Sequence, residues 1–168
     1  MDAEQLRALQ APLKERYRSI PDDAVITLKA RGRLGDESIS CKVETGKALV
    51  DAGLHPATGG DGSFACSGDM LLEALVACAG VTLKAVSTAL GVDLRGGLVS
   101  AEGDLDFRGT LGVDKQARVG FSDIRLRFEL DTDASAEQIE KVIRLTERYC
   151  VIYQTLRNPP PVSLRVGG

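Results

Sequence analysis

One stretch of the sequence, residues 69–91, restricts the possible folds more than any other. It is predicted to form a single helix that begins at Asp69, whose carboxylate is favourable at the positive end of a helix. At about 1.5 Å per residue this helix is roughly 35 Å long. Apolar side chains lie nearly all round it: Met70, Leu71, Leu72, Leu75, Val76, Val81, Leu83, Val86 and Leu90. A helix without a polar face is buried on all sides, so this one needs cover from further helices or a second subunit as well as from a sheet.

Alternation of apolar and polar residues predicts strands on both sides of the long helix. A hairpin around Gly35-Asp36 and a short strand precede the helix, and three further strands follow it. The predicted strands are residues 26–34, 39–43, 47–51, 99–107, 124–130 and 162–166. Because no regular strand–helix–strand repeat occurs, the predicted class is α+β with antiparallel sheets.

Two more helices are predicted. Residues 3–18 carry leucines at helical spacing, with a kink or break expected at Pro12. Ser135 and Gln138 form a capping box that opens the other helix. We expect that helix to break and to restart at Cys150, and the proline run that follows it to end it firmly.

Composition argues against several classes of function. Lys+Arg is 21 and Asp+Glu is 24, a net charge of −3, which is unlike a nucleic-acid binder with a general basic field. Trp is absent and aromatic residues make up 4%, so a base-stacking surface is not expected either. No uninterrupted apolar run approaches the ~20 residues that cross a bilayer, and the first residues do not resemble a signal peptide. We expect a soluble, cytoplasmic protein with no nucleic-acid or membrane partner.

Neither a metal nor a cofactor is predicted. The glycine-rich loop at 53–68 lacks the G-K-[ST] of a phosphate-binding loop. No C-x-x-C pair occurs, which argues against a zinc site. His55 is the only histidine, and no G-x-S-x-G elbow accompanies it. Cys41 is expected in the core of the sheet, and Cys66 is expected to be an exposed, oxidisable thiol in the loop.

Cys78 and Cys150 are the sharpest candidates for chemistry. Only the thiolate of a cysteine is nucleophilic, so a reactive one needs a nearby cation or a helix N-terminus. The restart of the helix at Cys150 would supply the second. Arg31 and Arg33, on the outward face of the first strand, would supply a cation for Cys78. On spacing alone, the alternative that both thiols are small core residues stays open.

Two segments carry a family resemblance: CSGDMLLEALVACAGVTLKAV and TERYCVIYQTLRNPPPV. Together they resemble the OsmC/Ohr family of hydroperoxide-handling proteins. The shared pattern is a carboxylate, then L-L-x-A-x-x-A-C on a long buried helix, then a second cysteine 72 residues later. GDLDFRGTLGV between them resembles the family's middle strand and turn. Val151-Ile152 follow the second cysteine where the Ohr branch has P-Y, so the resemblance is to the OsmC-like branch.

The resemblance covers roughly residues 24–167. It therefore predicts an N-terminal helical extension, residues 1–20, and an OsmC-like domain, residues 21–168. The implied fold has antiparallel sheets wrapped around long central helices in an intertwined homodimer. A second subunit of this kind would explain why the long helix is apolar all round.

The implied activity is that of a peroxiredoxin-like thiol peroxidase for organic hydroperoxides, and less well for hydrogen peroxide. Cys78 would be oxidised to a sulfenic acid, Cys150 would resolve it as a disulfide, and a dithiol would reduce the disulfide. The family's carboxylate corresponds to Asp69, and its arginine corresponds to Arg31 or Arg33 by strand position. The alternative function is a non-enzymatic dimer of the same fold that binds an apolar small molecule, with structural cysteines.

Overall fold

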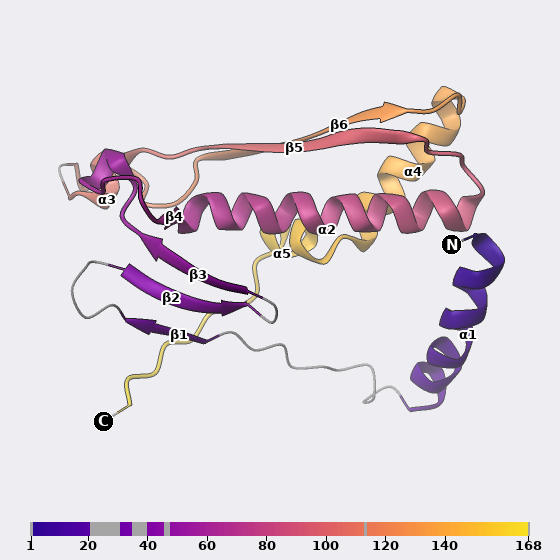
Figure 1. The fold of residues 1–168 in the computed structure, drawn as a ribbon, viewed down its shortest axis with the longest axis horizontal. Coiled ribbons are helices and arrows are strands. Elements are labelled where there is room, and N and C mark those ends of the chain that lie inside the picture. Colours follow the sequence, from indigo (N-terminus) through magenta and orange to yellow (C-terminus); the bar gives the residue numbers. More distant parts are fainter. Residues whose placement is uncertain (1, 21–30, 35–39, 46–47, 113, 168) are drawn as a thin grey trace. The chain divides into compact units, whose positions relative to one another are not determined.

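Figure 1 shows the computed structural model of the chain, which describes residues 2–20, 31–34, 40–45, 48–112 and 114–167. The elements in chain order are α1 (Ala3–Ser19), β1 (Arg31–Leu34), β2 (Ser40–Thr45), β3 (Ala48–Gly53), η2 (Pro56–Thr58), β4 (Ala65–Cys66), α2 (Ser67–Leu90), β5 (Gly96–Asp104), α3 (Phe107–Thr110), β6 (Asp123–Asp131), α4 (Ala136–Tyr149) and α5 (Val151–Arg157). Contacts divide the chain into two compact units, residues 1–9, 74–100 and 127–168 in the first, and residues 10–73 and 101–126 in the second. Helices and small, mainly antiparallel sheets confirm the α+β class.

The long helix predicted after the glycine-rich loop is α2. Its buried side chains recur at every fourth position: Leu75, Ala79, Leu83 and Ser87. This spacing puts them on one stripe of the helix. Other apolar residues of α2 are not covered, and Val81 is 73% exposed. Within the described residues, a single chain therefore buries one stripe of α2 and leaves the rest of the expected cover to be supplied from elsewhere.

By length and composition, α2 also meets the requirement for crossing a bilayer. Its most apolar window of 18 residues has a mean hydropathy of 1.7, and 28% of that window is buried. Central helices of water-soluble proteins meet the same requirement. The expectation that no membrane is involved therefore stays a prediction.

The core of the first unit joins α2, α4 and the two-stranded sheet β5–β6. Leu83, Leu94 and Val142 form its buried centre, and the partly buried residues around it are Val86, Val92, Phe128, Leu130 and Ile143. The Lys84 ammonium donates to the carbonyl oxygen of Leu94 at 2.6 Å, which ties α2 to the segment leading into β5. The predicted capping box is present at the start of α4, where the Ser135 hydroxyl accepts from the Gln138 N–H.

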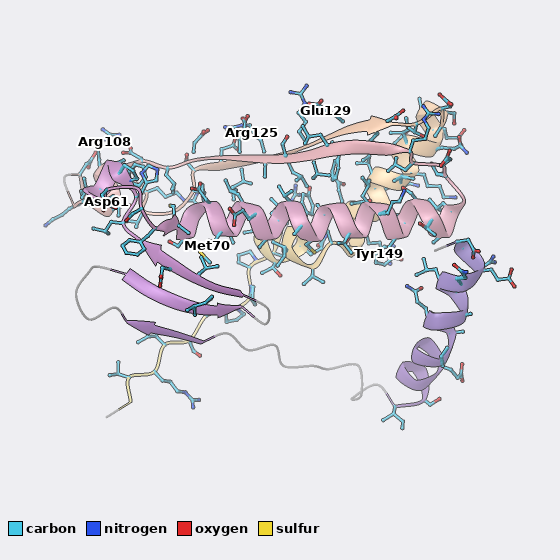
Figure 2. The ribbon with its side chains drawn as sticks, in the orientation of Figure 1. Asp61, Met70, Arg108, Arg125, Glu129 and Tyr149 are labelled. Atoms are coloured by element: carbon cyan, nitrogen blue, oxygen red, sulfur yellow. The ribbon has the colours of Figure 1, made fainter. Side chains whose placement is uncertain are left out.

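Strand β6 has the alternation that was predicted from its sequence. Its exposed and partly buried residues alternate along all nine positions. Arg125 and Glu129, labelled in Figure 2, belong to the exposed set. The alternation therefore gives β6 one wet face and one face toward the protein, as in an antiparallel sheet with one solvated side.

The second unit contains a four-stranded sheet in the order β1-β2-β3-β4. β1 and β2 pair antiparallel, with Arg33 opposite Lys42, so the predicted hairpin is confirmed. Its predicted turn at Gly35-Asp36 lies outside the described residues. β3 confirms the predicted third strand and pairs parallel with β4, with Ala52 opposite Ala65. This parallel pairing brings the end of the glycine-rich loop, where α2 begins, alongside β3.

Three predictions about the elements were wrong in detail. Residues 162–166 form no strand, and Val162 is 92% exposed, because alternation makes a strand only where another strand edge receives its backbone hydrogen bonds. β5 ends at Asp104 rather than at Phe107, because the Asp106 side chain accepts from the Arg108 N–H and caps the short helix α3. α1 continues through Pro12, so of the kink or break expected there the break does not occur.

Candidate active site

Cys150 is the single residue between α4 and α5. Its backbone is extended (φ −73°, ψ 109°), so it ends one helix and begins the next, as the sequence predicted. Its N–H donates to the carbonyl oxygen of Thr146 at 2.9 Å, and its carbonyl oxygen accepts from the Gln154 N–H at 2.9 Å. The residue is 1% exposed. The break leaves the first N–H groups of α5 without a partner in the preceding turn of helix.

The first N–H groups of α5 form hydrogen bonds with the other cysteine, Cys78. Cys78 lies on α2 as a half-buried free thiol, and its sulfur accepts hydrogen bonds from the N–H groups of Ile152 and Val151. The Cys150 thiol also donates to the Cys78 sulfur. All of these residues belong to the first unit. The fold thus brings together two thiols that are 72 positions apart in the sequence.

The environment of Cys78 favours its thiolate. Burial raises the pKa of this thiol, but the hydrogen bonds that its sulfur accepts act in the opposite direction and are together stronger. The main ones come from the Ile152 N–H, the Cys150 thiol and the Val151 N–H, with a smaller effect of the Thr82 hydroxyl, which itself donates to the Cys78 carbonyl oxygen at 2.8 Å. The net result is a pKa of Cys78 below the ordinary value of a cysteine thiol.

The environment of Cys150 favours its protonated form. Burial raises the pKa of the Cys150 thiol, while the N–H of Tyr153 acts against burial. The hydrogen bond to Cys78 and the negative charge on Cys78 raise the pKa of Cys150 further. The two thiols are therefore unequal: the pKa of Cys78 is lowered and that of Cys150 is raised.

This inequality predicts separate pH profiles for alkylation. Because its pKa is lowered, Cys78 holds more thiolate at a given pH than an unperturbed cysteine, and we expect its rate with iodoacetamide to reach half its maximum below the pH at which free cysteine does. Because its pKa is raised, Cys150 should reach half its maximal alkylation rate above the pH at which free cysteine does. Trypsin releases the two cysteines in separate peptides, 48–84 and 149–157. A Cys66→Ser background leaves Cys78 as the only thiol of the first peptide, and coincident profiles for the two peptides would contradict the prediction.

Sequence reasoning missed Thr82 and the backbone N–H groups of Val151 and Ile152. The cation expected beside Cys78 is not among the groups that lower its pKa within the described residues. The side chains of Arg31 and Arg33 lie outside the described residues, so their role stays a prediction. The available signal was the helix break at Cys150, which frees N–H donors, but the sequence did not say which thiol would receive them.

Asp69 lies in the second unit, where it lines a cavity of about 330 Å³ with Cys66 and His55. The His55 ring stacks on Phe107 with a centroid distance of 5.0 Å. Its Nδ1 accepts from the Ala57 N–H at 3.0 Å, so His55 caps the short helix η2. The role of Asp69 in positioning a peroxide stays a prediction.

The structure also places the two remaining candidate cysteines, Cys66 and Cys41. Cys66 is a half-buried free thiol rather than a fully exposed one. Cys41 lies on β2 opposite Ala52, and its side chain is outside the described residues. Among the residues that the structure describes, no three His, Cys, Asp or Glu side chains gather so as to hold a metal ion.

A family model described as OsmC-like protein matches residues 60–165. No curated protein matches the chain. Solved structures do. They include an OsmC like protein from Mycoplasma pneumoniae, 17% identical with a TM-score of 0.67, over 80% of this chain and 89% of that one.

Two other similar structures have functional names. An organic hydroperoxide resistance protein OsmC from Legionella pneumophila is 16% identical with a TM-score of 0.62, over 80% of this chain and 91% of that one. The organic hydroperoxide resistance protein OhrB of Bacillus subtilis is 17% identical with a TM-score of 0.55, over 80% and 93%. At these identities the likeness shows a common fold.

Proposed function

This chain belongs to the OsmC-like protein family, and we propose that it is a cysteine-based thiol peroxidase that reduces organic hydroperoxides. The observation that carries the proposal is the contact between two thiols with opposite pKa shifts, lowered for Cys78 and raised for Cys150. The hydroperoxide resistance proteins with the same fold support the choice of substrate class. Less efficient reduction of hydrogen peroxide is part of the same proposal.

In the first step, the Cys78 thiolate attacks the terminal oxygen of the hydroperoxide. An S–O bond forms, the O–O bond breaks, and the departing alkoxide takes a proton to leave as an alcohol. Cys78 becomes a sulfenic acid. The N–H groups of Val151 and Ile152 hold the sulfur in its thiolate form until the peroxide arrives.

In the second step, the sulfur of Cys150 attacks the sulfur of the sulfenic acid. An S–S bond forms, and the hydroxyl group leaves as water with a proton. Oxidation of Cys78 removes the negative charge that raises the pKa of Cys150. The first step therefore lowers the pKa of the resolving thiol, although burial, the largest cause of the raised pKa, remains. A dithiol reductant then restores both thiols by exchange.

The experiment that tests the function is oxidation with one equivalent of cumene hydroperoxide. We expect a disulfide that links the tryptic peptides 48–84 and 149–157, with formation of one equivalent of cumyl alcohol. Cys66→Ser serves as the control and should give the same cross-link, because it leaves Cys78 as the only cysteine in its peptide. Alcohol formation without the cross-link would remove Cys150 from the mechanism, and the absence of both would refute the proposal.

The alternative function, a non-enzymatic dimer that binds an apolar molecule, expects thiols of ordinary reactivity. The lowered pKa of Cys78 favours the peroxidase over this alternative. The alkylation profile described above separates the two experimentally. Arg31 or Arg33 as the cation that orients the peroxide, Asp69 as the carboxylate near it, and a cytoplasmic location complete the proposal.

A homodimer is also part of the proposal. The exposed apolar side chains of α2 are unusual for a surface helix, and a second copy of the chain would cover them. We expect Val81→Asp to weaken self-association by at least about a hundredfold, because an unpaired charge in an interface costs several kcal/mol. Sedimentation velocity over a range of concentrations measures this. Val119→Asp, at another exposed valine, is the control, and a monomeric wild type would contradict the expectation.

A further inference from the structure

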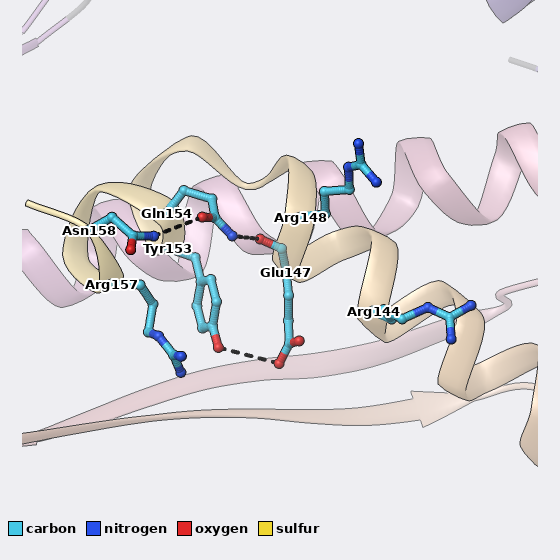
Figure 3. A pocket seen from close by; sticks show the side chains of 7 residues that line it. All are labelled: Arg144, Glu147, Arg148, Tyr153, Gln154, Arg157 and Asn158. Carbon is cyan, nitrogen blue, oxygen red and sulfur yellow. Dashed lines mark hydrogen bonds between the residues drawn. The ribbon is translucent and has the colours of Figure 1, made fainter.

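Three arginines gather at the corner between α4 and α5. Arg144, Arg148 and Arg157 line a groove of about 360 Å³, together with Glu147 and polar side chains of α5 (Figure 3). We refer to this as the corner groove. Its volume is that of a small-molecule site rather than of a protein interface. The groove lies within the first unit, which also contains both cysteines.

The corner groove keeps an excess of positive charge, because three arginines and one glutamate line it. Glu147 is the one acidic residue among its lining, and its carboxylate accepts from the Tyr153 hydroxyl at 3.3 Å. None of the three arginines forms an ion pair with a described carboxylate. Two of them lie over aromatic rings instead, Arg148 over Tyr149 at 5.6 Å and Arg157 over Tyr153 at 6.0 Å.

Two other arginines of the same unit, Arg95 and Arg127, do pair with carboxylates. Arg95 donates to the carboxylates of both Asp131 and Asp133. The chain as a whole has a net charge of −3, so carboxylates are not scarce. Guanidinium groups bind carboxylates in a planar, two-pronged geometry. An unpaired set of three in one groove therefore indicates a ligand that brings its own carboxylates.

The corner groove adjoins Cys150. A second cavity of about 500 Å³ is lined by Cys150, and it shares Arg148, Gln154 and Asn158 with the groove. Cys78 lines neither cavity. The cavity beside the groove is thus lined by Cys150 and not by Cys78, although Cys150 itself is only 1% exposed.

The chemistry of thiol–disulfide exchange also favours attack on the sulfur of Cys150. In a disulfide, attack by a thiolate is fastest when the sulfur that leaves is the more stable thiolate. The N–H groups of Val151 and Ile152 stabilise the thiolate of Cys78, so Cys78 is the better leaving group. A reductant should therefore attack Cys150, which is the cysteine beside the corner groove.

We propose that the corner groove binds the carboxylates of a small thiol reductant and directs its thiolate to Cys150. The proposal rests on the proposed function, because the Cys78–Cys150 disulfide is what the reductant consumes. The reductant sulfur forms a bond to Cys150 while the bond between Cys150 and Cys78 breaks, and Cys78 leaves as a thiolate. A second thiol, on the same or another molecule, attacks the reductant sulfur of the mixed disulfide. Cys150 then leaves and takes a proton, and the reductant ends as its own disulfide.

The test compares two monothiols of different charge on the oxidised protein. Mercaptosuccinate carries two carboxylates, and thioglycerol is neutral. For the double variant Arg144→Gln/Arg157→Gln at low salt, we expect the rate of reduction by mercaptosuccinate to fall about tenfold and that by thioglycerol to change less than about twofold. Added salt should slow mercaptosuccinate alone on the wild type. Arg118→Gln, an exposed arginine of the second unit, is the matched control and should change neither rate.

Equal loss for both thiols would show a structural effect and overturn the proposal, as would no loss for either. If peroxide does not give the disulfide, the proposed function fails. In that case diamide is used to form the disulfide, and the comparison of mercaptosuccinate with thioglycerol still decides the role of the groove. If neither oxidant gives the disulfide, calorimetric titration of the reduced protein with succinate decides it. Weaker binding by the double variant supports the anion site, and equal binding overturns it.

Discussion

Peroxide consumption is expected to fall by at least about a thousandfold when Cys78 is replaced by serine, because a neutral hydroxyl replaces the thiolate that attacks the peroxide. The hydrogen bonds from Val151 and Ile152 remain available to the serine oxygen, so the fold should be retained. The measurement is the rate of cumene hydroperoxide loss in the presence of excess dithiothreitol.

Two matched variants separate the roles of the other thiols. Cys66→Ser is expected to keep the parent rate, because Cys66 lies in the second unit and no step uses it. Cys150→Ser is expected to consume one equivalent of peroxide rapidly and to leave Cys78 as a sulfenic acid, which dimedone traps. A Cys78→Ser variant that consumes peroxide at the parent rate would refute the proposed function.

Truncation of Leu83 to alanine is expected to lower the free energy of unfolding by about 3 kcal/mol, the usual cost of a cavity in a packed core. Leu83 is 4% exposed and packs with Leu94 and Val142 at the centre of the first unit. Urea denaturation at a fixed protein concentration measures the change through the midpoint of unfolding.

Leu98→Ala is the matched control for this prediction. It removes the same atoms from the same unit, but Leu98 is 57% exposed. We expect a change of less than about 1 kcal/mol there, because little cavity is left at the surface. Equal losses for the two variants would show that Leu83 is not at the centre of the core.

Local signals in the sequence predicted local structure well. The Ser135 and Gln138 pair marks the start of α4, and the alternation from Ile124 to Leu130 marks β6, because capping and period-two burial depend on residues close together in the chain. The break at Cys150 was also expected from the sequence. The structure shows a short helix, α5, between this break and the proline run.

Signals that depend on distant parts of the chain were harder to interpret. The alternation at Val162, Leu164 and Val166 says that a strand is possible but not whether an edge is available for it. The apolar surface of α2 says that cover is needed but not which molecule supplies it. For Cys78, the donors come from the turn after Cys150, and no rule of spacing connects positions that far apart.

The helix junction at Cys150 is built by main-chain atoms. Its N–H completes the last turn of α4 and its carbonyl oxygen opens the first turn of α5, so neither of these hydrogen bonds involves the sulfur. The side chain can pass through thiol, disulfide and mixed disulfide while the scaffold that carries it keeps these bonds. A reactive cysteine at such a helix junction can therefore go through repeated cycles of oxidation and reduction without the backbone hydrogen bonds having to re-form each time.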